Sequence, residues 1–342
     1  MPLNNFPNIY EQQKRNKFLT FVIMFAFVLF FIFLGYGFDL FYFGNDPLGI
    51  FYENIGIPIG TFAALVIGVL LALNGLSNGA KAVLNSTGAY PINESSQEHI
   101  RLKNVVEEMK IASGLPMPKI YIVPDPDPNA FATGSKPENS YIAVTEGLLK
   151  TLNRDELQAV VAHEMGHIRN YDIRLMTIVA ALIGAVVLLS DFAIRGLRFG
   201  AAGKSTKRSR SSSSGPLAII LMILWIVGII LAPIISRLLA MAISRQREYY
   251  ADATAAELTR NPLALASALE KLDKASEPTK SIKQGSAHLC IVDPLNLKVN
   301  NKEGFLADLF ATHPPIQKRI NILKGMAYQY ETKKEQKTTS ST

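Results

Sequence analysis

The chain has 342 residues, of which 49% are hydrophobic and 18% are charged, a balance that argues against a purely soluble protein. Its one cysteine, Cys290, excludes an intramolecular disulfide. The formal net charge of +7 comes without a basic stripe interleaved with aromatic residues, so we expect no nucleic-acid partner.

The N-terminal region contains two uncharged apolar runs, residues 18–34 and 55–73. Each run is long enough, as a helix, to cross a hydrocarbon core of about 30 Å. Basic residues precede the first run within segment 1–17, whereas the connection 35–54 carries acidic residues and no Lys or Arg. The positive-inside rule therefore predicts a cytoplasmic segment 1–17 and two transmembrane helices within 18–74, in a multi-pass protein of the cell membrane.

Residues 75–173 and 237–326 are predicted to form the two parts of one α+β domain. The first part contains an amphipathic helix ending near Gly114 and then three β-like runs, which predict a small antiparallel sheet. These runs are residues 119–123, 129–133 and 141–144. The second part predicts helices at 236–258, 262–275 and 314–326, and the polar tail 327–342 is expected to be disordered.

Between these parts, segment 174–236 is predicted to be a hydrophobic hairpin. Its apolar runs, 175–189 and 216–235, flank a loop at 195–215 that is rich in serine and basic residues. The length of the second run favours two membrane crossings. The positive charge of the loop favours a shallow hairpin that does not cross, which stays open as the alternative to the two crossings that we expect.

A metal-binding pattern follows the predicted sheet. Asn153 with Glu156 three residues later forms a capping-box pattern, which predicts the start of a helix. On this helix His163 and His167 lie one turn apart on the same face, so their imidazoles converge. Glu164 is offset by about 100° and can take a proton from a water that the metal ion activates. An HExxH string also arises by chance, so a third ligand decides whether the site is real.

The third ligand is predicted to be Glu248, which is followed one helical turn later by Asp252. Catalytic zinc sites use three protein ligands and leave a fourth position to water, so Glu248 would complete a site for one zinc ion per subunit. Asp252 is then placed to accept the second ring N–H of a ligating histidine. The alternative is that these two acidic residues form a solvated helix face.

The chain also resembles a known family, the HtpX-like membrane zinc peptidases, which are relatives of the prenyl-protein CAAX endoprotease. The matching strings are Asn129-Ala-Phe-Ala-Thr-Gly134, His163-Glu-Met-Gly-His167, Arg247-Glu-Tyr-Tyr-Ala-Asp252, Asn261-Pro-Leu-Ala-Leu-Ala-Ser-Ala-Leu269 and Thr312-His-Pro-Pro315. The resemblance implies a mainly α membrane protein with a zincin-like α+β catalytic domain. It implies zinc at His163, His167 and Glu248, base catalysis by Glu164, and a role in quality control of misfolded membrane proteins.

Two further elements are expected to support catalysis, because both resemble features of this family. The run Asn129, Ala130, Phe131 and Ala132 would be an exposed strand edge that pairs with the backbone of an extended substrate. Its alternative role is ordinary sheet core, with Phe131 packed inward. His313, which precedes two prolines, would stabilise the developing oxyanion, although a lone histidine is more often structural.

Three other functions are weighed against this interpretation: an intramembrane-cleaving zinc protease, a CAAX-processing protease and a non-catalytic membrane scaffold. An HExxH helix that carries Arg154, Asp155 and Arg169 is too polar to lie in lipid. Glu164 argues against a scaffold, because a structural zinc would take a fourth protein ligand. The expected partners are unfolded or membrane-protein substrates and the lipid bilayer, with the active site on the cytoplasmic side.

Overall fold

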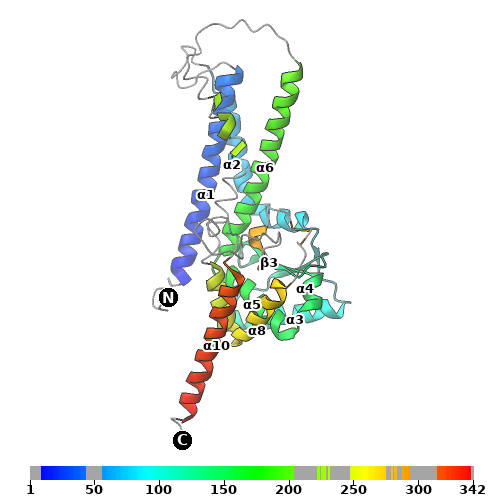
Figure 1. Cartoon of the computed structure of the whole chain (residues 1–342). Helices are drawn as coiled ribbons and strands as arrows, with labels where there is room; N and C mark the ends of the chain where they lie inside the picture. Colours follow the sequence, from blue (N-terminus) through cyan, green and yellow to red (C-terminus); the bar gives the residue numbers. More distant parts are fainter. Residues whose placement is uncertain are drawn as a thin grey trace.

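The computed structural model describes residues 9–43, 56–203, 222–223, 225–228, 230–231, 247–274, 279, 281–282, 287–292 and 314–339. Three long helices form one end of the molecule, and a domain of helices around a small sheet forms the other (Figure 1). This architecture confirms the predicted mainly helical fold class. The loop from residue 204 to 215 and His313 lie outside the described residues.

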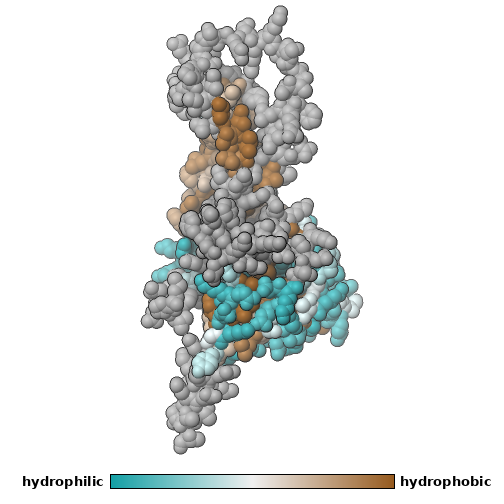
Figure 2. Space-filling model, viewed as in Figure 1, coloured by the Kyte–Doolittle hydropathy of each residue, from teal (hydrophilic) through white to brown (hydrophobic). Residues whose placement is uncertain are grey.

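The long helices are α1 (Ile9–Phe38), which continues as the π-helix η2 (Asp39–Phe43), α2 (Ile59–Ser86) and α6 (Asp172–Gly203). They pack side by side through a buried cluster that includes Phe27, Phe31, Leu175, Ile178 and Leu182. Their outward faces carry exposed apolar side chains, among them Phe21, Phe25 and Leu70. Figure 2 shows these helices as a brown surface above the teal surface of the domain.

The stretches 10–41 and 59–86 are each long and apolar enough to cross a membrane. α6 is long and apolar enough only when it is counted together with the preceding helix, residues 154–169. Both predicted transmembrane runs are therefore found as helices, each longer than its apolar core. The predicted loop boundary at 195 is wrong, because α6 continues to Gly203. The choice between a crossing and a shallow hairpin depends on residues outside the described part of the chain.

The sheet has the strand order β1-β2-β4-β3. Its strands are β1 (Tyr90–Pro91), β2 (Lys119–Val123), β3 (Ala130–Lys136) and β4 (Asn139–Thr145). β1 with β2 and β3 with β4 are antiparallel, but β2 and β4 are parallel, so the predicted antiparallel sheet is wrong and the sheet is mixed. The cause is the proline-rich connection after β2, which carries the chain past the position of β4 to the far edge, so the β3–β4 hairpin returns β4 beside β2.

Four further helices complete the domain: α3 (Gln97–Ser113), α5 (Arg154–Arg169), α8 (Pro262–Asp273) and α10 (Ile316–Thr339), with the short α4 (Glu146–Thr151) directly after β4. α5 lies in the centre, and twelve of its sixteen residues are buried. α10 continues to Thr339, so the disordered tail predicted from residue 327 is wrong. The tail is polar, but seven of the thirteen residues from 327 to 339 are Glu, Lys or Gln, which have high helix propensity.

The first turn of α5 is fixed by a capping box and by hydrogen bonds to α8. The Asn153 side chain accepts from the Glu156 N–H, and the Glu156 carboxylate accepts from the Asn153 N–H, each at 2.9 Å, which is the predicted capping box. Glu156 also accepts from Ser267 Oγ and Lys271 Nζ of α8, each at 2.7 Å. The helix that carries the HExxH motif is therefore anchored to the second part of the domain.

The substitution Glu156→Ala should destabilise the chain by roughly 2 kcal/mol, because it removes a cap and charged hydrogen bonds. Asp155→Ala is the matched control, since Asp155 is acidic, lies in the same turn and is exposed. Asp155→Ala should lower the free energy of unfolding by less than about 1 kcal/mol. Melting temperatures of the full chain in detergent measure the difference, and equal losses would contradict the anchoring role.

This stabilisation should also depend on pH. Burial raises the pKa of Glu156, but the hydrogen bonds from Lys271, the Asn153 N–H and Ser267 outweigh it and hold the pKa below its ordinary value of 4.5. The contribution is therefore complete above pH 4.5 and is lost as the pH falls through the folded pKa. The melting-temperature gap between wild type and Glu156→Ala should shrink in acid.

Candidate metal centre

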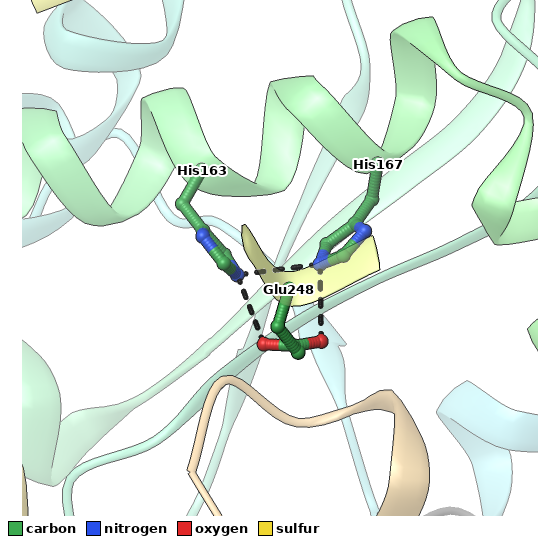
Figure 3. Close-up of side chains that lie close together, drawn as sticks. All are labelled: His163, His167 and Glu248. Carbon is green, nitrogen blue, oxygen red and sulfur yellow. Dashed lines mark hydrogen bonds and ion pairs between the residues drawn. The ribbon is translucent and has the colours of Figure 1, made fainter. Parts of the chain in front are cut away.

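His163 and His167 lie in the C-terminal half of α5 and are both buried. Their rings point to the same side of the helix, as predicted, and the two Nε2 atoms are 3.2 Å apart (Figure 3). Glu248 comes from the helix formed by residues 247–259. Its carboxylate oxygens lie 3.5 Å from His163 Nε2 and 3.6 Å from His167 Nε2. The three predicted ligands therefore meet at one point, although Glu248 is far from the two histidines in sequence.

Gly166 allows the two helices to approach this closely. A Cβ atom at this position would lie 3.2 Å from Ala251 Cα and 3.2 Å from Thr254 Cβ of the helix that carries Glu248. These distances are tighter than most contacts of a real Cβ. The glycine between the two histidines therefore sets how near Glu248 comes to the imidazoles.

Each imidazole is oriented by a buried carboxylate. His163 Nδ1 lies 3.0 Å from Asp252 Oδ1, and His167 Nδ1 lies 3.0 Å from Asp172 Oδ2. A carboxylate that accepts the Nδ1 proton leaves the Nε2 lone pair free. With only the two Nδ1 atoms protonated, as metal binding requires, two Nε2 lone pairs and the Glu248 carboxylate would face one another, an arrangement that a cation stabilises. Asp252 lies where the sequence predicted it, whereas Asp172 was not anticipated.

Arg319 of α10 was also missed by the sequence interpretation. Its guanidinium is buried and donates to both oxygens of Asp252, at 2.7 and 2.8 Å, and it lies 3.2 Å from Glu248 Oε2. It also donates to the Ile291 carbonyl at 2.8 Å. The available signal was helical spacing, because Arg319 falls on the same face of α10 as the buried Ile320 and Leu323.

The buried charges shift one another's proton affinities. Burial lowers the pKa of His163, but its hydrogen bonds to Asp252 and Glu248 outweigh this effect and raise the pKa to about 9. Burial raises the pKa of Glu164, and this effect exceeds the opposing influence of the two histidines. Burial also raises the pKa of Asp252, but Arg319 outweighs it and holds that pKa below the usual range. Glu164 is thus a carboxylate in a dry site, adjacent to the converging ligands.

The strand proposed to bind substrate lies directly against Glu164. β3 is an edge strand, and the backbone of Ala132 faces the buried Glu164 carboxylate and lowers its pKa. The expectation of an exposed edge is wrong at Asn129, Ala130, Phe131 and Ala132, which are all buried. The cause is residues 287–292, since the Ile291 N–H donates to the Ala130 carbonyl at 3.0 Å and Cys290 pairs with Phe131 in an antiparallel bridge.

Residues 96–327, a range that includes the three converging ligands and Glu164, match the family model described as Peptidase family M48. The chain belongs to peptidase family M48. A protein named Protease HtpX homolog from Streptococcus gordonii is 39% identical over 318 residues, which are 93% of this chain and 100% of that protein. A second one, from Caldanaerobacter subterraneus subsp. tengcongensis, is 41% identical over 320 residues, 93% of this chain and 98% of that protein.

These matches confirm the resemblance to the HtpX-like peptidases that the sequence motifs indicated. They make the chain a membrane protein of a metalloprotease family. A solved structure, the crystal structure of S. mikatae Ste24p, aligns with a TM-score of 0.48 and 20% identity over 92% of this chain and 67% of that chain.

Replacing Arg319 should disrupt this M48 site. Arg319→Met leaves the buried carboxylates of Asp252 and Glu248 without their cation, so we expect a loss of about 3 to 5 kcal/mol in stability. Metal affinity should fall by about 10- to 100-fold, because the support of His163 is lost. Lys318→Met is the control, since Lys318 is exposed and adjacent. Melting temperature and elemental analysis measure both effects, and wild-type values in Arg319→Met would contradict the assignment.

Proposed function

We propose that this M48 peptidase is a zinc-dependent endopeptidase whose metal is bound by His163, His167 and Glu248. The carrying observation is the spacing of the ligand atoms, at 3.2, 3.5 and 3.6 Å. A tetrahedral zinc with bonds of about 2.0 to 2.2 Å would hold its ligand atoms about 3.3 to 3.6 Å apart. Two imidazoles and one carboxylate also match the donor set of catalytic zinc sites, which keep a fourth position open.

The chain's own residues then supply the acid–base chemistry. Zinc, when bound, lowers the pKa of a water and polarises the scissile carbonyl. Glu164 takes the proton of the attacking water and passes it to the leaving amine, a task that suits a carboxyl group whose pKa is raised by burial. Asp252 and Asp172 keep the imidazoles in the ligating orientation. His313 is proposed to stabilise the oxyanion, as the family resemblance implies.

Separating metal binding from proton transfer tests this assignment. Glu164→Gln should keep its zinc and lose turnover by about 10²- to 10⁴-fold, because only the base is removed. Glu248→Ala should lose both zinc and activity. Glu107→Gln, on the exposed face of α3, is the matched control and should behave like wild type. Elemental analysis and cleavage of an unfolded membrane protein give the readouts, and a Glu164→Gln variant with normal turnover would refute the mechanism.

We also propose that the zinc site faces the cytoplasm. The first turns of α1, which carry Lys14, Arg15 and Lys17, lie at the same end of the helix bundle as the catalytic domain (Figure 1). Lys17 Nζ lies 4.2 Å from the centre of the Tyr171 ring, at the junction of α5 and α6. The positive-inside rule places this basic end in the cytoplasm. This orientation is expected whether or not segment 204–246 crosses the membrane.

Single cysteines in a Cys290→Ser background test this orientation. A cysteine at Asn54, in the predicted outer connection, should react with an impermeant thiol reagent in intact cells. A cysteine at Ser95, exposed on the catalytic domain, should react only after the membrane is permeabilised. Reaction of the Ser95 cysteine in intact cells would place the active site outside and refute the proposal.

The proposed substrates are unfolded segments of membrane proteins, bound by pairing with β3. The backbone N–H and carbonyl groups of Asn129 form hydrogen bonds with Thr145 of β4. Because peptide groups alternate in direction along a strand, those of Ala130 and Ala132 point away from β4, to the outer side of β3. Ile291 already occupies the Ala130 carbonyl. The Ala132 carbonyl, next to Glu164, is therefore the acceptor that we propose for a substrate N–H. Main-chain pairing of this kind suits a protease that tolerates many sequences.

Backbone N-methylation of a cleaved peptide, one residue at a time, tests strand pairing without altering the enzyme. We expect KM to rise at alternate residues near the scissile bond, because every second N–H of a paired strand points to its partner. Methylation at the intervening residues of the same peptide is the internal control. A uniform KM profile would contradict pairing with β3.

A further inference from the structure

The corner between α5 and α6 is held by one polar face of the first membrane helix. The two helices meet at an angle of 83°, and Tyr171 at the corner has a φ of 59°, in the left-handed region. Gln13 of α1 donates to the Arg169 carbonyl at 2.8 Å, and Asn16 donates to the Asn170 carbonyl at 2.9 Å. Lys17 adds the cation–π contact with Tyr171. The spacing of the three α1 residues places them on one helix face.

Asn16 differs from its two neighbours because it also reaches the metal site. Its Nδ2 group donates to Asp172 Oδ1 at 2.7 Å, and Asp172 Oδ2 lies 3.0 Å from His167 Nδ1. Asn16, Asp172 and His167 are all buried, so water does not compete for these bonds. Both Nδ2 protons of Asn16 are used, which fixes the orientation of its amide.

The bond from Asn16 restrains a carboxylate that would otherwise be held loosely. Within the described part of the chain, Arg247 also lies beside Asp172 Oδ1, but its Nε is 3.5 Å away, too far for a strong hydrogen bond. A carboxylate that accepts from a ligating histidine sets the tautomer and the ring orientation of that ligand. Restraining Asp172 therefore restrains His167 Nε2, the atom that faces the metal position.

We propose that Asn16 is a positioning residue for His167, acting through Asp172, so that a residue of the first membrane helix sets the affinity of the catalytic zinc site. This inference rests on the proposed zinc site. It also couples the metal centre to the position of α1, because a shift of α1 relative to the corner would break the bond to Asp172. Gln13 and Lys17 also contact the corner, but Gln13 donates to the Arg169 carbonyl and Lys17 lies over the Tyr171 ring, so neither interaction involves Asp172.

The test is the zinc dissociation constant of the full chain in detergent, measured by competition with a chelator. Asn16→Ala should raise Kd by about tenfold, the lower end of the effect of removing a group that supports a ligand. Gln13→Ala is the matched control, because it removes the neighbouring hydrogen bond to the corner and should leave Kd unchanged. The zinc-free melting temperature of both variants measures the purely structural loss separately.

A double-mutant cycle tests the route of the effect. If Asn16 acts through Asp172, Asn16→Ala should not weaken zinc binding further in an Asp172→Ala background. Additive losses would overturn the proposal. Should Asn16→Ala fail to fold, Asn16→Ser provides the same measurement, since its hydroxyl is too short to reach Asp172.

The outcomes distinguish this inference from the proposed function. A wild-type chain that binds no zinc would overturn the proposed function and the inference that rests on it. Zinc binding by the wild type, with an unchanged Kd in the Asn16 variant, would overturn the inference alone. A higher Kd in Asn16→Ala but not in Gln13→Ala would support it.

Discussion

The structure depends on a balance between the negative and positive side chains that are buried together around the two imidazoles. Around the two imidazoles it buries four carboxylates and two guanidinium groups, which belong to Glu164, Asp172, Glu248, Asp252, Arg247 and Arg319. With all six ionised and both imidazoles neutral, as metal ligands must be, the charge of this group is −4 + 2 = −2, which a divalent cation would bring to zero. Buried charge without a partner is costly, so the donor set and the charge balance independently favour a metal ion at this position.

This balance requires segments that are distant in sequence to fold together. The histidines come from α5, Glu248 from the helix of residues 247–259, and Arg319 from α10. None of these helices can bury its charged residue alone, because each charge finds its partner on another helix. The metal site and the core of the catalytic domain are therefore one cooperative unit, and metal binding contributes to folding.

The sequence predicted those residues whose spacing within one helix reveals their role. His163 with His167, and Glu248 with Asp252, are pairs one turn apart, so a single helical period indicates their shared face. Asp172 has no such signal, because its partner lies across a corner. The helical spacing of Arg319 indicates that it is buried but not which residues it contacts, because those residues lie on another helix. The direction of β2 against β4 was also hidden, since alternation identifies a strand but says nothing of the strand beside it. The burial of the β3 edge depends on Ile291, which pairs with it from a distant segment.

The sharp corner at Tyr171 explains how one chain combines a membrane helix with a polar catalytic site. A straight continuation of α6 would carry the HExxH helix along the axis of the bundle, whereas the 83° bend turns it into the core of the domain. The left-handed φ of Tyr171 costs of order 1 kcal/mol, and the contacts from α1 offset it. This gives a structural role to Gln13, Asn16 and Lys17 in the polar first turns of α1, where they stabilise the corner. The membrane helix is therefore part of the catalytic domain's structure as well as its anchor.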